Sequence, residues 1–248
     1  MGLALGAFAV LPGLAVGSFL NVVASRLPER RSLVRPRSAC RSCRTPIAWY
    51  DNVPLLSYLL LGGRCRACRT PIGRIYPAVE LATSVLLAAC VVAFGFTLHA
   101  LAAAVFCAAL VVVTATDLTH RIVPNLVVLP AAAIVCVLMT AAEPSPEWAI
   151  AGLGAAAFLL LVALSYPGGM GMGDVKLALL MGVALGRTVA VALPLGMVLA
   201  LVPAAVLFAR HGSGARKMAI PFAPFLALGS VIALFAGDAL VHAYTSLF

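Results

Sequence analysis

Long apolar segments follow one another along almost the whole chain, and they constrain the fold more than any other feature of the sequence. Of the 248 residues, 63% are hydrophobic and only 10% are charged, which leaves too few polar groups to cover a globule in water. A helix needs roughly 20 apolar residues to cross a bilayer. We therefore predict an all-α polytopic membrane protein with about eight transmembrane helices, near residues 3–25, 78–97, 99–116, 124–142, 147–166, 174–186, 188–209 and 220–246.

The cations are distributed unevenly between the loops. If the first helix runs from outside to inside, only Arg187 of the 17 Lys and Arg residues falls in an outer loop. The positive-inside rule favours this orientation, which places both chain ends outside the membrane. The net charge of +9 then faces anionic lipid headgroups, so no nucleic acid partner is expected.

A polar insert between the first two predicted helices carries two Cys-x-x-Cys pairs. Such pairs together supply the four thiolates of a tetrahedral, zinc-ribbon-like site. Four filled positions leave no room for water, so we expect one structural Zn²⁺ rather than a catalytic one. Two disulfides are the alternative, but the predicted topology puts this loop in the reducing cytosol. Short strands are expected here, with turns at Trp49–Pro54 and Gly62–Gly63. The predicted ligands are Cys40, Cys43, Cys65 and Cys68.

Two carboxylates interrupt the apolar pattern at helix ends. Asp117 closes the third predicted helix and Asp174 opens the sixth, so both are expected near the cytosolic face. An Asp within a bilayer costs roughly 2.5 to 3.5 kcal/mol on insertion scales, which favours a functional role. Two carboxyl groups in one site share a proton and supply an acid and a base for attack of water on a peptide bond. Helix capping by each Asp separately is the alternative.

The residues around Asp174 support the functional interpretation. The segment Tyr166–Gly173 is rich in Gly and Pro, and backbone without side chains at Gly171 and Gly173 would let an extended substrate approach Asp174. Lys176 either tunes the carboxyl pair or serves as a topology charge. Competing hypotheses are a proton-coupled transporter with a zinc-ribbon regulatory loop, and a membrane-anchored zinc-ribbon scaffold.

Several motifs together resemble those of the bacterial prepilin peptidases, the type IV leader peptidases among the membrane aspartyl proteases with a Gly-x-Gly-Asp motif. The resemblance extends nearly from end to end of the chain. It rests on segments 17–28, 49–58, 76–81, 117–125 and 171–176, together with the two cysteine pairs.

The resemblance implies a bifunctional enzyme of the bacterial inner membrane. Such enzymes cleave the basic leader of type IV prepilins and type II secretion pseudopilins at the cytosolic face, and then methylate the new N-terminus with S-adenosylmethionine. It implies Asp117 and Asp174 as catalytic residues, with Asn21 and Glu80 as candidate polar members of the methyl-donor site. The corresponding regions are a first helix at 1–25, a cysteine loop with the methyltransferase function at 26–77, and a peptidase core at 78–248.

Overall fold

The computed structural model describes residues 2–165, 170–212, 214 and 220–246. Within this part of the chain, seven helical stretches are long and apolar enough to cross a membrane. One of them, Met172–His211, contains two of the helices defined below, because a short 3-10 turn joins them almost without interruption. The predicted all-α membrane fold is therefore confirmed.

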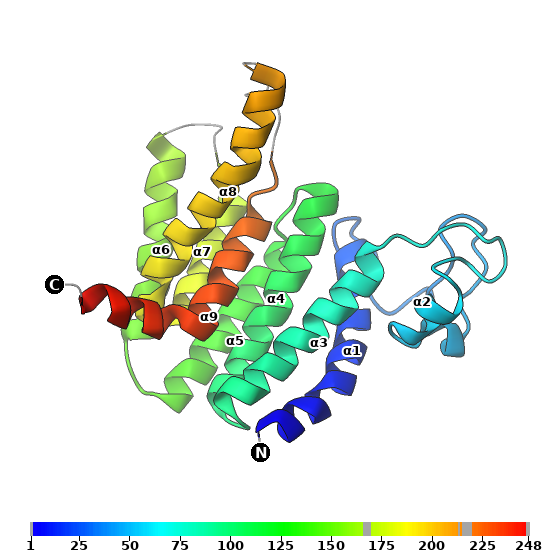
Figure 1. Ribbon diagram of the computed structural model, residues 1–248, viewed down its shortest axis with the longest axis horizontal. Helices are drawn as coiled ribbons and strands as arrows, with labels where there is room; N and C mark the ends of the chain where they lie inside the picture. Colours follow the sequence, from blue (N-terminus) through cyan, green and yellow to red (C-terminus); the bar gives the residue numbers. More distant parts are fainter. Residues whose placement is uncertain (1, 166–169, 213, 215–219, 247–248) are drawn as a thin grey trace. The chain divides into compact units, whose positions relative to one another are not determined.

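The chain divides into two compact units, residues 1–96 and 97–248. The first unit contains the long helices α1 (Gly2–Arg26) and α3 (Ile75–Phe94), which lie side by side (Figure 1). Between them the chain forms the insert, residues 27–74, with a 3-10 turn η1 (Trp49–Asn52) and a short helix α2 (Leu56–Leu60). The functional division of the chain at residues 25 and 77 stays a prediction.

Two glycines bring α1 and α3 into close contact. A Cβ atom on Gly13 would lie 2.7 Å from Ser84 Cα, and one on Gly17 would lie 2.7 Å from Glu80 Cα. Ser84 Oγ also donates a hydrogen bond of 2.9 Å to the carbonyl oxygen of Val10. The small residues of a Gly-x-x-x-Gly pair thus allow the two backbones to approach within one chain.

The insert differs from the prediction of short strands. Among its described residues there are only two isolated β-bridges, Ala39 with Pro46 and Arg64 with Pro71. The predicted turn at Trp49–Pro54 contains η1, and the apolar residues that follow it form α2 instead of a strand. Because neighbouring chain segments offer no long partner edge, local helical hydrogen bonds satisfy this backbone.

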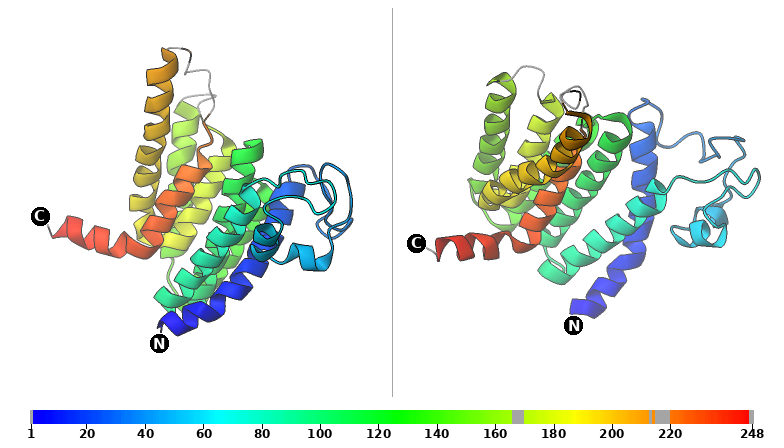
Figure 2. Two further views of the ribbon diagram at one scale, coloured as in Figure 1. Left: turned by 45° about the vertical axis from the view of Figure 1, so that its right-hand side comes forward. Right: turned by 45° about the horizontal axis from the view of Figure 1, so that its top comes forward.

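Among its described residues, the second unit is a bundle of six helices around α7 (Figures 1 and 2). Helix α7 contacts the other five long helices of this unit, and most of its side chains are buried. Its 14 residues confirm that the sixth predicted helix is short. The bundle comprises α4 (Leu98–His120), α5 (Asn125–Ala142), α6 (Glu147–Ser165), α7 (Met172–Leu185), α8 (Val189–His211) and α9 (Ala223–Thr245), with the 3-10 turn η2 (Gly186–Thr188) between α7 and α8.

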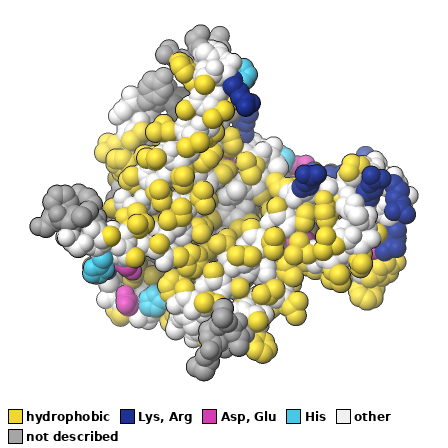
Figure 3. All heavy atoms as spheres, viewed as in Figure 1, with side chains coloured by type: hydrophobic (Ala, Val, Ile, Leu, Met, Phe, Trp, Pro, Cys, Tyr) yellow, Lys and Arg dark blue, Asp and Glu magenta, His cyan; other side chains and the backbone are white. Residues whose placement is uncertain are grey.

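Apolar side chains fill the centre of this bundle and also cover its outside. Phe106, Leu177 and Met181 are fully buried, whereas Phe158 and Leu161 on α6 are 50% and 65% exposed. Figure 3 shows apolar side chains over most of the visible surface. A chain with apolar residues on both sides of its helices is suited to lipid rather than water.

Candidate functional site

Asp117 lies in the last turn of α4 and is only 7% exposed. Its Oδ2 atom accepts a hydrogen bond of 3.1 Å from the backbone N–H of Ala223, the first residue of α9. Helix α4 ends at His120, and the next residue, Arg121, has left-handed backbone angles and donates its N–H to the carbonyl oxygen of Asp117. The carboxylate is therefore fixed by the end of one helix and the start of another.

Asp174 lies in the first turn of α7 and is partly buried. Its N–H donates a hydrogen bond of 3.1 Å to the carbonyl oxygen of Gly171. Helices α4 and α7 pack against each other, and the carboxyl groups lie close enough for the charge of Asp117 to act on Asp174. The fold thus brings together two acidic groups that are far apart in the sequence.

The glycines beside Asp174 have different surroundings. Gly171 precedes α7 in an extended conformation, and a Cβ atom there would lie 3.5 Å from Asp174 Oδ2 and 3.9 Å from the backbone nitrogen of Gly173. A Cβ atom on Gly173 would lie 2.7 Å from the Cβ atom of Val123. Gly173 therefore lets α7 approach the turn that follows Asp117. The rest of the predicted glycine-rich segment, residues 166–169, lies outside the described residues.

Lys176 connects the two segments that carry the aspartates. Its Nζ atom donates a hydrogen bond of 2.9 Å to Oδ1 of Asn125, the first residue of α5. Asn125 follows Asp117 through the turn between α4 and α5, and Lys176 follows Asp174 on α7. This hydrogen bond ties the start of α7 to the start of α5.

Asn21 and Glu80 lie in the first unit, where α1 packs on α3. Asn21 Nδ2 donates a hydrogen bond of 2.9 Å to the carbonyl oxygen of Tyr76. Glu80 Oε2 accepts one of 2.9 Å from the N–H of Leu55 in the insert. Both side chains are buried, at 8% and 9% exposed, and both serve structural contacts here.

The four cysteines of the insert form one cluster. Their Sγ atoms all lie within 4.8 Å of one another, and the Cys40–Cys68 and Cys43–Cys65 distances are 3.7 and 4.0 Å. Tetrahedral zinc with Zn–S bonds of about 2.3 Å requires sulfur atoms about 3.8 Å apart, so the arrangement fits Zn²⁺. A disulfide needs about 2.05 Å, so these cysteines are not paired covalently.

Threonine hydroxyls support two of these sulfur atoms. Thr45 Oγ1 lies 3.3 Å from Cys43 Sγ, and Thr70 Oγ1 lies 3.2 Å from Cys68 Sγ. These contacts lower the pKa of Cys43 and lower the pKa of Cys68 to about 6. A lower pKa favours the thiolate, which is the form that binds a metal.

Some features of the sites were not predicted from the sequence. Residues 40–47 and 65–72 differ only at Ser42 and Ala67, and this repeat signals two equivalent knuckles. In each knuckle the first cysteine donates its N–H to the threonine carbonyl, at 3.0 and 2.9 Å. The contact between Ala223 and Asp117 has no such sequence signal, because the donor is a backbone amide.

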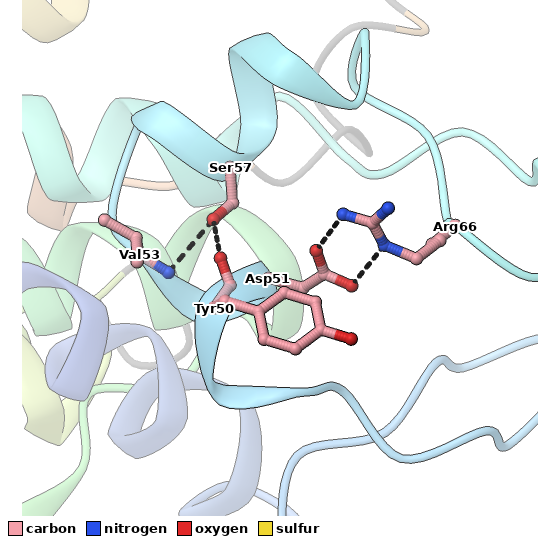
Figure 4. Close-up of polar contacts among 5 residues, drawn as sticks. All are labelled: Tyr50, Asp51, Val53, Ser57 and Arg66. Atoms are coloured by element: carbon pink, nitrogen blue, oxygen red, sulfur yellow. Dashed lines mark hydrogen bonds and ion pairs between the residues drawn. The ribbon is translucent and has the colours of Figure 1, made fainter.

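An ion pair in the insert was also missed. Arg66, inside the second knuckle, donates from Nε and Nη2 to the two carboxylate oxygens of Asp51 at 2.7 and 2.6 Å (Figure 4). The guanidinium also lies 5.6 Å from the ring centroid of Tyr50. The Arg66 guanidinium lowers the pKa of Asp51.

Comparison with known protein families covers both units. Residues 11–94 match the bacterial peptidase A24 N-terminal domain, and residues 104–244 match the type IV leader peptidase family. The second match includes Asp117 and Asp174, and the first includes the cysteine cluster. No solved structure matches this chain.

Curated relatives match over nearly the full length. The prepilin leader peptidase/N-methyltransferase of Bacillus subtilis is 35% identical over 243 residues, which cover 95% of this chain and 96% of the relative. The proteins of the same name from Pseudomonas aeruginosa and Burkholderia pseudomallei are 34% and 37% identical, covering 95% and 93% of this chain and 91% and 85% of those proteins. The resemblance inferred from the motifs is confirmed, and the chain belongs to the type IV leader peptidase family.

Proposed function

We propose that this chain is an aspartyl endopeptidase in which Asp117 and Asp174 form the catalytic pair. The observation that carries the proposal is the packing of α4 against α7, with Asp117 in the last turn of α4 and Asp174 in the first turn of α7, within the region that matches a peptidase family. Two carboxylates in one site cannot both ionise cheaply, so the pair holds one proton.

The reaction follows from this shared proton. The ionised carboxylate removes a proton from a water molecule, whose oxygen attacks the carbonyl carbon of the scissile peptide bond. The protonated carboxyl group donates its proton to the developing oxyanion. When the resulting tetrahedral intermediate collapses, the C–N bond breaks and the amine leaves with a proton from the pair.

The surroundings of Asp117 suit this role. Its Oδ2 atom accepts a hydrogen bond from the Ala223 amide, which fixes the orientation of the carboxylate. Lys176 and Asn125 keep the α7 start beside the α4–α5 turn.

Prepilins and pseudopilins are the proposed substrates. The curated relatives are named for action on prepilin leaders. A prepilin has a basic leader followed by an apolar helix, so its cleavage site lies where polar and apolar environments meet. Asp117 and Asp174 lie at helix ends, which suits a cleavage site at that depth.

N-methylation of the new N-terminus is proposed as the second activity, since the relatives carry this name. S-adenosylmethionine would supply the methyl group. One structural Zn²⁺ on the four insert cysteines would fix the shape of a loop with few buried residues. Asn21 and Glu80 are proposed at the donor site because they lie where the insert joins α3.

The proposed orientation places the insert and both aspartates at the cytosolic face, with the two chain ends outside. The cation distribution of the sequence supports it. Asp117 and Asp174 would then meet the leader on the side where prepilins are made. The enzyme would be a multi-pass protein of the bacterial cytoplasmic membrane.

Cleavage of a prepilin by purified enzyme in detergent tests the proposal. Asp117→Asn and Asp174→Asn should each lower the cleavage rate at least ~1,000-fold, because neither variant can share a proton in the pair. Asp238→Asn is the matched control, since Asp238 lies on α9 with its side chain 72% exposed and paired to Arg187. If either Asp variant reached its normal abundance in the membrane and cleaved prepilin at the wild-type rate, the catalytic role of Asp117 and Asp174 would be ruled out.

The transporter and scaffold hypotheses lose support from the family match, because that family consists of peptidases. Both also predict no cleavage by the purified wild-type protein. The same assay therefore separates all three functions.

A further inference from the structure

An apolar tip projects from the insert. On α2, Leu56, Leu59 and Leu60 are 53%, 73% and 76% exposed, and their spacing places them on one face of the helix. Trp49, on η1 packed against α2, is 83% exposed. We call Trp49, Leu56, Leu59 and Leu60 the apolar tip. Four large apolar side chains clustered on a small polar insert indicate an interaction surface.

Polar contacts of neighbouring residues hold the tip in shape. Ser57 Oγ donates to the carbonyl oxygen of Tyr50 at 2.9 Å and accepts from the N–H of Val53 at 3.0 Å (Figure 4). The bidentate pair of Asp51 with Arg66 joins η1 to the second cysteine knuckle. The exposed side chains therefore sit on a braced element rather than on a loose loop.

A further contact sets the position of the tip along α3. Leu55 has a φ of 57° and is the centre of a tight turn closed by the N–H of Leu56 and the carbonyl oxygen of Pro54, 2.6 Å apart. Its own N–H donates to Glu80 Oε2 on α3. The strained turn is held by a residue of a membrane-spanning helix, so the tip has a defined level relative to that helix.

That level lies within the length of the two long helices. In Figures 1 and 2, α2 lies level with the middle part of α1 rather than beyond the end of α1 at Arg26. Just past Glu80, α3 exposes Leu81 and Val85, at 52% and 57%. The tip is thus continuous with an apolar helix face suited to lipid.

Cations lie on another side of the insert. Arg64 and Arg69 are exposed, and Figure 3 shows Lys and Arg side chains gathered along the upper and outer edge of the insert, with apolar side chains below. Elements that lie in a membrane interface typically have apolar residues, including Trp, on one side and Arg on the other.

We propose that the apolar tip inserts into the bilayer interface and anchors the insert against the membrane surface. The occupant is lipid rather than a protein, because the tip is fixed at the level of two membrane spans and is flanked by cations that match anionic headgroups. This inference does not depend on the peptidase or methyltransferase chemistry.

Tryptophan fluorescence of the full-length protein in vesicles tests it. The chain has 2 Trp residues, so Trp148→Phe leaves Trp49 as the single reporter. In vesicles of phosphatidylcholine and phosphatidylglycerol, brominated acyl chains should lower the Trp49 emission about twofold or more, and acrylamide should quench it weakly. Strong acrylamide quenching without any effect of the brominated lipid would overturn the proposal.

Matched variants distinguish insertion of the apolar tip from a Trp49 that is merely close to lipid. The triple variant Leu56→Ser, Leu59→Ser, Leu60→Ser should abolish most of the bromolipid quenching of Trp49. Val34→Ser, at an equally exposed position elsewhere in the insert, should leave it unchanged. Equal bromolipid quenching in the triple variant and its parent contradicts the proposal.

Two other occupants give different results. If the second unit covered the tip, Trp49 would be shielded from acrylamide equally in detergent and in vesicles, and bromolipid would have no effect. If a prepilin covered it, shielding would appear only after the prepilin was added. Either result overturns the proposal. Zinc content measured in each variant verifies that the insert has kept its fold.

Discussion

The insert and the helical bundle of the second unit are stabilised by different forces. In the insert, Ser57 is one of few buried residues, and the chain is held by hydrogen bonds, one bidentate ion pair and four clustered thiols. In the bundle, apolar side chains such as Phe106, Leu177 and Met181 are fully buried. A segment with little core needs a metal or an outside support, whereas a packed bundle does not.

This difference suggests a division of labour. The bundle can hold Asp117 and Asp174 rigidly, because both lie at ends of well-packed helices. If the cysteine cluster holds Zn²⁺ as proposed, loss of this ion should unfold the insert. Perturbing one region should therefore leave the chemistry of the other largely intact.

Among variants that affect the insert and the bundle differently, the largest effect is expected from loss of the zinc site. Cys43→Ser should remove nearly all bound zinc, because structural zinc contributes roughly 10 to 16 kcal/mol in small domains. Methylation of the cleaved product should fall on the order of 100-fold, whereas leader cleavage should persist. Elemental analysis and product mass measure both, and Cys136→Ser on α5 is the control, because Cys136 lies outside the cluster.

An equal loss of cleavage and methylation in Cys43→Ser would break the comparison. It would mean that the insert also supports the peptidase site. A wild-type protein without zinc would remove the metal centre altogether.

A cavity in the bundle should lower the stability of the bundle and leave zinc binding by the insert unchanged. Phe106→Ala removes a fully buried ring and should cost about 3 kcal/mol of stability. The thermal midpoint in detergent should fall while the zinc content stays at one ion per chain. Phe158→Ala, at a half-exposed position in the same unit, should change the thermal midpoint little. A drop similar to that of Phe106→Ala would show that side-chain burial does not determine the stability of this bundle.

Removal of one backbone donor should affect catalysis more than stability. Ala223→Pro deletes the N–H that Asp117 accepts, at the first helical position, where proline is tolerated. We expect kcat to fall roughly 10- to 100-fold with KM nearly unchanged, since the contact orients a reacting group.

Ala223→Gly is the control for that variant, because it keeps the N–H and removes only a methyl group. It should retain most of the wild-type kcat. Equal activity of the proline variant and the wild type would show that the start of α9 does not position Asp117.

The smallest effect is expected from the ion pair of the insert. Asp51→Asn should speed zinc release to a chelator at pH 7 by roughly threefold, because the second knuckle loses its brace. Arg66 lowers the pKa of Asp51, so the pair stabilises the insert fully above the unfolded pKa of about 3.9, and this contribution is lost as the pH falls through the lower folded value.

The difference between Asp51→Asn and the wild type should therefore vanish in strong acid. Persistence of a constant difference at all pH values would assign the effect to packing rather than to charge. Arg31→Gln, in an exposed pair with Glu29, should not change zinc release.

The sequence predicted the parts of the structure that have strong local signals. Long apolar runs predicted the helices, and paired cysteines predicted the thiol cluster. The positions of Asp117 and Asp174 at helix ends were also predicted correctly. These features depend on hydropathy and spacing, which can be read along the chain.

The remaining features depend on contacts between distant segments. Helix α2 was predicted as part of a strand-and-turn region, because a run as short as Leu55–Leu61 does not distinguish helix from strand. Gly173 beside Val123 and the Ala223 amide on Asp117 could not be predicted, since both arise only when helices pack. The sequence thus predicted where the two aspartates and the four cysteines lie, but not the contacts that hold them.

The residual cleavage rates of single and double Asp variants test the central claim most directly. If Asp117 and Asp174 act as one proton-sharing unit, removal of the second group costs nothing further. The double variant Asp117→Asn, Asp174→Asn should therefore cleave a prepilin as slowly as either single variant. Single variants with modest losses that multiply in the double variant would contradict it.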